Sequence, residues 1–494
     1  MGAQASGAEQ GVGSSVSSGA SNDNWHDIET SADDPNGLRG KRVLVMGLGL
    51  LGGGVASARY AVAQGAAEVT VTDLRSEEML APSVARLAGL PIRYALGRHD
   101  PDEFRAADVV VRNPNVRRDS PYLAIAREAG KRIEMEIAWF FRACPGKIAG
   151  VTGTRGKSTT TLLLHHILQG AGLDPLLGGN LGGIETLTLL PQITPDRWTV
   201  LELGNWMLEG LHTVRRSPQL AIFTNLLPDH LDAYDSMDDY GQAKTSIFRY
   251  QRPGDIAIFN ADNDYSSRYA GEAPSDGVWL YSAERGVCYP RERPTETRPF
   301  SYAEAIRLRG AHNVANVQAA ALAAELLGLG ETSIRAGIET FGGAPHRLEV
   351  VRELDGVTWV NDSASTAPVA GVAALRSFSE PVVLIAGGNT KKIDHSAWAT
   401  EAATRAKRII LLKGSATDDF AADVRAAAAR AGRPDPIEGV YDDFVAAIQR
   451  ARELAAPGDV VLLSPGFTSF GMFLHEFDRG EQFRALTLAL PEQP

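Results

Sequence analysis

The chain has few cysteines and no apolar run long enough to cross a membrane. Among its 494 residues only Cys144 and Cys288 are cysteines, far apart and outside any CxxC spacing. Neither a disulfide framework nor a zinc site is therefore indicated. The longest apolar runs are strand-sized, well below the ~20 residues that a bilayer span requires. We expect a soluble protein in a reducing cytoplasm.

Basic residues are also fewer than acidic residues. The formal net charge is -11, which argues against a sequence-independent nucleic-acid surface, although local sites for small anions remain possible. Residues 1–38 are rich in small and polar residues and nearly free of large aliphatic side chains, so we expect a disordered tail there. The remaining length suggests about three domains, which we place at residues 39–146, 147–343 and 344–494.

A glycine-rich turn is the clearest functional signal. Residues 150–158 read Gly-Val-Thr-Gly-Thr-Arg-Gly-Lys-Ser, between an apolar strand and a helical pattern at 159–169. Such a turn can direct backbone N–H groups at phosphate oxygens, with Lys157 as a point charge and Ser158 reaching Mg²⁺. Gly150 lies one residue too far from Gly156 for the usual P-loop, which weakens a GTPase or motor interpretation. The alternative is that the turn only connects a strand to a helix and has no ligand.

The first segment has the pattern of a nucleotide-binding unit. An apolar strand at 41–46 precedes Gly47-Leu-Gly49-Leu50-Leu51-Gly52 and an alanine-rich helical stretch, and a second strand ends at Asp73. This spacing is typical of a Rossmann domain. A lone GxGxxG is weak evidence, so NAD and other nucleotide diphosphates remain equally open.

Polar residues follow two strands of the next segment. Glu202 ends the strand expected at 198–202, and Asp229-His230-Leu-Asp232 follow the strand expected at 220–225. Groups past strand ends beside a phosphate loop lie where metal and phosphate chemistry occurs. Mg²⁺ prefers oxygen ligands, so His230 is either an unusual ligand or a helix cap.

From residue 344 strands and helices alternate again, which predicts a third α/β unit with a largely parallel sheet. The turns at 387–392 and 464–469 follow two of its strands and are expected to face one crevice.

Several motifs occur together in a fixed order. They are Thr152 to Thr159, Gly178-Gly-Asn180, Glu202, Asp229-His230, Lys244, His312-Asn313, Pro345 to Glu349, Asn361-Asp362-Ser363 and Leu463-Ser464-Pro465. On these motifs the chain resembles the Mur ligase family over about residues 40–490. Residues at both ends, Asp73 and Arg75 together with Ser469 and Arg479, favour the branch of that family that adds D-glutamate.

The resemblance implies an activity and its cofactors. The family transfers the γ-phosphoryl group of ATP to a terminal alanine carboxylate, and the amine of glutamate then attacks the acyl phosphate. The implied substrates are UDP-N-acetylmuramoyl-L-alanine, D-glutamate and ATP, with Mg²⁺ and a carbamylated Lys244. An ordinary surface lysine is the default interpretation of Lys244 without the family. We expect a monomer with three domains: a Rossmann-like domain that binds UDP instead of NAD, a P-loop-type ATPase domain and a Rossmann-like amino-acid domain.

The resemblance also assigns residues to sites. The catalytic set is Lys157, Glu202, His230 and Lys244, and the metal set is Ser158, Glu202, His230 and Lys244. The ATP set is Gly153, Thr154, Gly156, Lys157, Ser158, Thr159, Asn313, Asn316, Arg347 and Asp362. The UDP set is Gly47, Gly49, Leu50, Leu51, Gly52, Asp73, Arg75 and Asn180. The glutamate set is Thr366, Lys391, Ser469 and Phe477.

The chain departs from the family pattern at three places. Gly204-Asn205 replace two serines, Ala364 replaces a lysine, and Glu476 stands where an aromatic is expected, with Phe477 next to it. These changes concern the amino-acid pocket, so an L-glutamate-adding or other sibling ligase stays open. A dehydrogenase and a non-catalytic nucleotide-sugar sensor are the alternatives from other classes.

Overall fold

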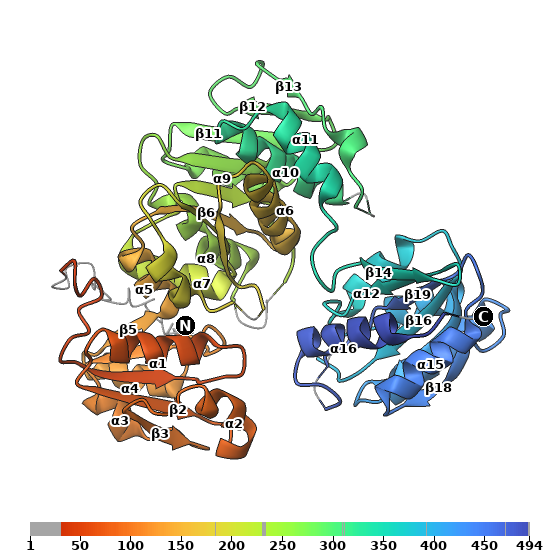
Figure 1. The fold of residues 1–494 in the computed structure, drawn as a ribbon, viewed down its shortest axis with the longest axis horizontal. Helices are drawn as coiled ribbons and strands as arrows, with labels where there is room; N and C mark the ends of the chain where they lie inside the picture. The colour runs from red at the N-terminus through yellow and green to blue at the C-terminus, as the bar shows by residue number, and fades with distance from the viewer. Residues whose placement is uncertain are drawn as a thin grey trace, which may run out of the picture.

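The computed structural model describes residues 31–182, 184–229, 234–308, 310, 312–391, 393–469 and 471–492. Within them the chain forms three α/β units in succession, each built on its own sheet (Figure 1). This confirms the expected fold class. His230, Asp232 and residues 1–30 of the expected tail lie outside the described residues. No described helix is long and apolar enough to span a bilayer.

The first unit is a parallel sheet in the order β3-β2-β1-β4-β5. Its strands are β1 (Arg42–Met46), β2 (Glu68–Asp73), β3 (Ile92–Leu96), β4 (Val109–Arg112) and β5 (Arg132–Met135). Its helices are α1 (Gly53–Ala63), α2 (Glu77–Ala85), α3 (Pro101–Ala106) and α4 (Pro121–Glu128). The strand order reverses beside β1, so the turn after β1 lies at a switch point, where such sheets bind ligands.

The second unit has the sheet order β13-β12-β11-β10-β9-β6-β8-β7, and β6, with the phosphate loop at its end, lies between β8 and β9. Helix α5 (Glu136–Ala143) connects the two units. The strands are β6 (Lys147–Thr152), β7 (Leu176–Gly179), β8 (Trp198–Glu202), β9 (Leu220–Phe223), β10 (Ile256–Asn260), β11 (Gly277–Ser282), β12 (Val287–Pro290) and β13 (Arg298–Pro299). The helices are α6 (Lys157–Gly170), α7 (Asn205–Val214), α8 (Met237–Arg249), α9 (Asp264–Glu272), α10 (His312–Leu326) and α11 (Glu331–Thr340), with 3-10 turns η2 (Thr186–Gln192) and η3 (Ala303–Ala305).

The third unit has the sheet order β14-β15-β19-β16-β17-β18. Only its edge pair β14–β15 is antiparallel among the described pairings of this sheet. The strands are β14 (Glu349–Leu354), β15 (Val357–Asn361), β16 (Val382–Gly387), β17 (Ala406–Leu412), β18 (Ile437–Tyr441) and β19 (Val460–Leu463). The helices are α12 (Pro368–Arg376), α13 (Ser396–Arg405), α14 (Thr417–Arg430), α15 (Phe444–Leu454) and α16 (Glu476–Ala489).

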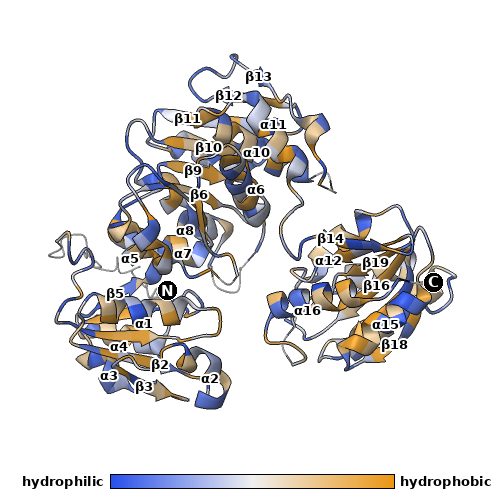
Figure 2. Cartoon of the chain, in the orientation of Figure 1, coloured by the Kyte–Doolittle hydropathy of each residue, from blue (hydrophilic) through white to orange (hydrophobic). Residues whose placement is uncertain are grey.

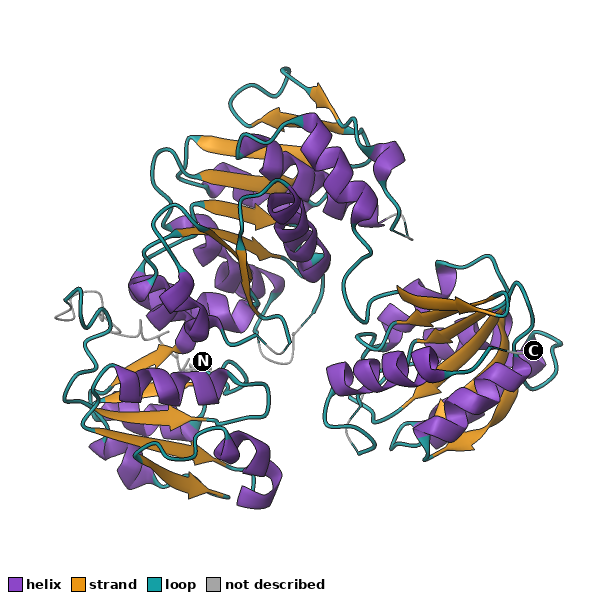
Figure 3. Cartoon of the chain, in the orientation of Figure 1, coloured by secondary structure: helices purple, strands orange, loops and turns teal. Residues whose placement is uncertain are grey.

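Apolar strands covered on both faces by helices account for the cores. Figure 3 shows helices on both sides of the sheets, and Figure 2 shows the hydrophobic residues concentrated on the strands between them. All six residues of β16, Val-Val-Leu-Ile-Ala-Gly, are buried. Continuous apolar strands of this kind are expected where helices cover both faces of a parallel sheet.

The end of the expected disordered tail needs a correction. Asn36 and Leu38 are fully buried. The Asn36 side chain donates to the Tyr60 hydroxyl (2.8 Å) and accepts from Arg142 (2.6 Å), and its carbonyl accepts from Arg132 (2.8 Å). Buried polar groups need such partners, so this part of residues 1–38 belongs to the folded first unit.

Candidate active site

The phosphate loop lies between β6 and α6. Gly156 ends it with φ 82, and a Cβ there would lie 2.1 Å from Oδ1 of Asn316, so only glycine fits. Thr154 is buried and its N–H donates to the Asn225 carbonyl (2.9 Å). Lys157 Nζ donates to the carbonyls of Gly153 (3.1 Å) and Thr154 (3.0 Å). Ser158 and Thr159 follow in the first turn of α6, where helix N–H groups favour anions.

Lys244 reaches the same loop from α8. Its side chain is only 1% exposed, and Nζ donates to the Gly153 carbonyl (3.2 Å) and lies 4.8 Å from the Tyr240 ring centroid. Burial lowers the pKa of Lys244 well below its usual value, and the neighbouring Lys157 charge lowers it further. No ion pair within the described residues includes Lys244. The default interpretation of an ordinary surface lysine is therefore wrong.

Glu202 supplies the carboxylate of this cluster. It ends β8 with 2% exposure, and Oε1 accepts from the Asn180 side chain (3.1 Å). Its buried Oε2 has no hydrogen-bond partner among the described residues. An orphaned carboxylate oxygen fits a hard cation such as Mg²⁺. Asn180, which was predicted to bind the UDP substrate, therefore contacts Glu202, the candidate metal ligand. Its binding of UDP stays a prediction.

The described residues supply few protein ligands for a metal ion. No group of three or more His, Cys, Asp or Glu that could hold a metal occurs in the described part of the chain. Mg²⁺ commonly takes one or two protein ligands and completes its shell with phosphate oxygens and water. The metal roles of Ser158 and Glu202 stay predictions, and the predicted metal role of His230 concerns a residue outside the described chain.

Two asparagines lie at the other side of the loop. Asn313 and Asn316 are buried on α10, and the Asn316 amide donates to Asn313 Oδ1 (2.9 Å). Because Asn316 also lies against Gly156, the pair is fixed relative to the phosphate loop. Their contact with adenine stays a prediction.

The third unit carries Arg347 and Asp362, the two remaining residues of the predicted ATP set. Burial lowers the pKa of Lys157, while the charge of Glu202 raises it and the charge of Arg347 lowers it, so Arg347 is close enough for its charge to act on Lys157. Asp362 follows β15 and accepts from the Ser464 hydroxyl (2.7 Å). Burial raises the pKa of Asp362 to about 6.

The turn after β1 has the shape expected of a diphosphate cradle. Gly47, Gly49 and Gly52 all have positive φ, and Leu50 and Leu51 lie between them. The Asp73 carboxylate accepts from the N–H groups of Gly49 (3.1 Å) and Arg75 (2.9 Å). Asp73 therefore shapes the loop, while its contact with uracil stays a prediction.

Two carboxylates at this cradle were missed from the sequence. Glu185 pairs with Arg86, and its Oε1 would lie 2.6 Å from a Cβ at Gly52. Glu136 Oε2 would lie 2.9 Å from a Cβ at Gly53, and burial raises the pKa of Glu136 to about 7. Both carboxylates therefore lie at the N-terminus of α1. No local sequence signal links them to that turn.

The predicted amino-acid residues divide between two places. Thr366 and Lys391 line one small hollow, and Lys391 Nζ donates to the Thr366 hydroxyl (3.1 Å). Burial lowers the pKa of Lys391. Ser469 is 4% exposed, and its hydroxyl has no partner among the described residues. Phe477 is not among the residues lining that hollow.

Phe477 instead marks a contact between the second and third units. A Cβ at Gly182 would lie 2.7 Å from its ring, so the ring packs on that glycine. The same ring lies 6.0 Å from the His346 ring, centroid to centroid. Its role toward glutamate stays a prediction.

Comparisons with known proteins follow the same division into units. Residues 41–134 match the model "Mur ligase MurD-like, N-terminal domain", residues 151–324 "Mur ligase middle domain", and residues 346–467 "Mur ligase, glutamate ligase domain". A protein of Roseiflexus sp. (strain RS-1), named UDP-N-acetylmuramoylalanine--D-glutamate ligase, is 47% identical over 468 residues, covering 91% of this chain and 98% of that protein. The chain belongs to the Mur ligase family.

Other Mur ligases match the chain at lower sequence identity. A protein of the same name from Acetivibrio thermocellus is 35% identical over 459 residues, covering 91% of this chain and 96% of its own. Among solved structures, the Mur ligase MurC from Thermotoga maritima aligns with TM-score 0.59 at 19% identity, covering 91% of this chain and 99% of its own. MurF from Acinetobacter baumannii aligns with TM-score 0.53 at 16% identity, covering 93% and 92%. At these identities the structural matches show the fold alone.

Proposed function

We propose that the chain is an ATP-dependent, ADP-forming ligase that joins D-glutamate to UDP-N-acetylmuramoyl-L-alanine in cytoplasmic peptidoglycan precursor synthesis. The observation that carries the proposal is the convergence of Lys157, Lys244 and Glu202 at one phosphate loop, in a chain 47% identical to a protein named for that reaction. We propose that it acts as a monomer. The exact domain limits stay a prediction.

The first step is phosphoryl transfer. A carboxylate oxygen of the substrate's alanine attacks the γ-phosphorus of ATP, the bond to the β-phosphate oxygen breaks, and ADP leaves with that electron pair. Both reactants are anions, so positive charge is needed between them. Lys157 provides it at the loop and Arg347 from the third unit. Mg²⁺, held by Ser158 and Glu202 with His230 and Lys244 at a second position, would neutralise phosphate charge.

The second step forms the amide. The neutral amine of glutamate attacks the acyl carbon, phosphate leaves, and the nitrogen loses a proton. Lys391 and Thr366 offer a cation and a hydroxyl for a carboxylate of glutamate. Docking of the third unit on the second, as at Phe477 and Gly182, would exclude the water that hydrolyses acyl phosphates.

Lys244 has an unusual part in the proposal. A buried ammonium beside a second lysine is costly, and its lowered pKa favours the neutral amine. The neutral Nζ can attack the carbon of CO₂, and loss of one proton leaves a carbamate. The side chain then carries a negative charge that suits a metal ion in place of a positive charge that repels it.

The test is phosphate release from ATP with UDP-N-acetylmuramoyl-L-alanine and either D-glutamate, L-glutamate or no amino acid. Turnover with D-glutamate alone supports the proposal. A preference for L-glutamate shows a variant ligase, and no turnover with either returns the sensor and sibling-ligase alternatives. Lys157→Ala should abolish release. The matched control is Lys147→Ala, because Lys147 lies at the opposite end of β6 with its side chain 46% exposed.

A further inference from the structure

Arg347 lies in a turn with an unusual backbone. The residues on either side of it, His346 (φ 59) and Leu348 (φ 47), are both left-handed although neither is glycine. Such conformations persist only where the surroundings impose them, and they concentrate at functional sites. The contacts that impose this turn are therefore informative.

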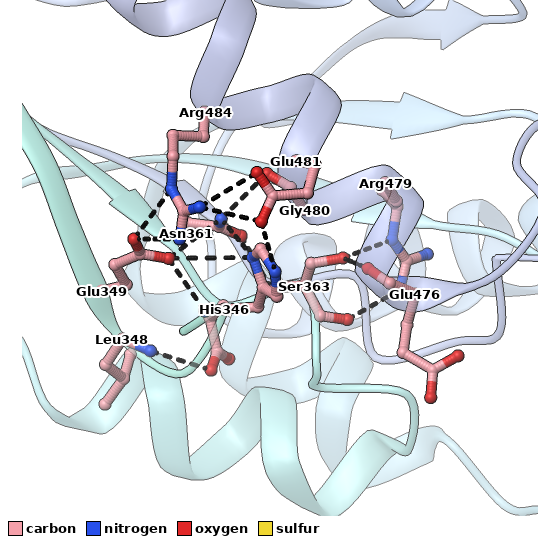
Figure 4. A network of polar contacts seen from close by, with 11 residues as sticks. His346, Leu348, Glu349, Asn361, Ser363, Glu476, Arg479, Gly480, Glu481 and Arg484 are labelled. Atoms are coloured by element: carbon pink, nitrogen blue, oxygen red, sulfur yellow. Dashed lines mark hydrogen bonds and ion pairs between the residues drawn. The ribbon is translucent and has the colours of Figure 1, made fainter. Parts of the chain in front are cut away.

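The His346 ring is held in a closed polar pocket (Figure 4). The ring is buried, Nδ1 lies 2.9 Å from the Asn361 amide nitrogen, and Nε2 lies 3.2 Å from Glu481 Oε1. Because the amide donates to Nδ1, the proton of the neutral ring is on Nε2 and points at Glu481. A Cβ at Gly480 would lie 2.3 Å from Nδ1, so the ring packs directly on the backbone of α16.

Backbone hydrogen bonds fix the turn on both sides of Arg347. The His346 N–H donates to Glu349 Oε2 (2.8 Å), and the Leu348 N–H donates to Asp362 Oδ1 (3.2 Å). Glu349 is held in turn by Arg484 of α16 (2.6 Å). The turn is thus clamped between the edge hairpin β14–β15 and α16, while the Arg347 side chain itself is exposed.

We propose that His346 is a positioning residue, which, by locking this left-handed turn against α16, holds Arg347 in the orientation that meets the nucleotide phosphates. The proposal rests on the proposed function, since it deepens the ATP site of that function. His346 touches no reacting atom in this scheme and acts through Arg347 alone.

A double-mutant cycle tests this relation. The four proteins are wild type, His346→Ala, Arg347→Ala and the double variant, and affinity for a fluorescent ATP analogue is measured together with kcat and KM for ATP. We expect His346→Ala to weaken nucleotide binding about 10-fold or more. The double variant should bind as weakly as Arg347→Ala, because the effects of mutating two residues that act together do not add. If the loss of affinity in the double variant equals the product of the losses in the two single variants, the proposal is wrong.

Further variants separate positioning from general stability. His346→Asn should recover most of the loss, since asparagine tolerates a left-handed backbone and keeps polar atoms. A His346→Asn protein as impaired as His346→Ala, with an unchanged melting temperature, counts against the proposal. His166→Ala is the matched control, because His166 lies on α6 with an exposed hydrogen bond to Thr340. Analogue binding needs neither glutamate nor the UDP substrate, so failure of the ligase reaction would leave the cycle measurable.

Discussion

Replacing Gly156 by alanine should weaken nucleotide binding, because the structure shows a steric clash between the added Cβ and Asn316. The residue has φ 82, and its added Cβ would lie 2.1 Å from Asn316 Oδ1. A left-handed alanine costs about 1–2 kcal/mol. Real Cβ contacts stay above 3.0 Å, so the loop or Asn316 must also move by roughly 1 Å, and a displacement of that size can reduce a rate by about 100-fold.

The assay is equilibrium binding of an ATP analogue, with a denaturant melt of the same protein. We expect affinity to fall at least about 10-fold and stability to fall by about 1–2 kcal/mol. Gly170→Ala is the matched control, because Gly170 lies on the same helix with open space at its Cβ position; it should gain about 0.4–1 kcal/mol. A Gly156→Ala protein that binds nucleotide within about twofold of wild type would refute the reasoning.

The remaining predictions concern three other places. Lys244→Ala should lose ligase activity and regain part of it with a short carboxylic acid; full activity without the acid removes the carbamate from the mechanism. The folded-state pKa of Asp362 is raised to about 6, so its contribution to stability is complete below pH ~4 and is lost as the pH rises through about 6. In denaturant melts across that range, Asp362→Asn should remove a pH-dependent change in stability that totals about 3 kcal/mol, and an unchanged pH dependence contradicts it. Deleting residues 1–38 should cost about 1.5–3 kcal/mol more than deleting residues 1–30, because Leu38 is fully buried; equal melting temperatures would contradict this.

Much of the fold could be predicted because buried parallel strands are continuous apolar runs. The strand expected at 198–202 coincides with β8. Strand β14 was missed because it is an edge strand with only one fully buried residue, so it is not a continuous apolar run. The sequence did carry a hairpin signal, because Asp355-Gly356 is a pair typical of tight hairpin turns. In the structure both residues have positive φ, as such a turn requires.

The site was less accessible to sequence reasoning. The loop residues are local, and their pattern predicts a phosphate cradle directly. Lys244 meets the Gly153 carbonyl across 91 residues, and only the family resemblance linked the two. Glu185 and Glu136 had neither a local pattern nor a family motif, because their position depends on how the first and second units pack.

The buried Asn36 also constrains the order in which the protein can mature during synthesis. Its carboxamide oxygen accepts from Arg142, 106 residues later in the chain. Domains emerging from a ribosome generally fold as units from the amino end. Here the start of the first unit lacks one of its buried partners until the helix leading into the second unit has been made. This buried hydrogen bond of the first unit can therefore form only after α5 has been synthesised.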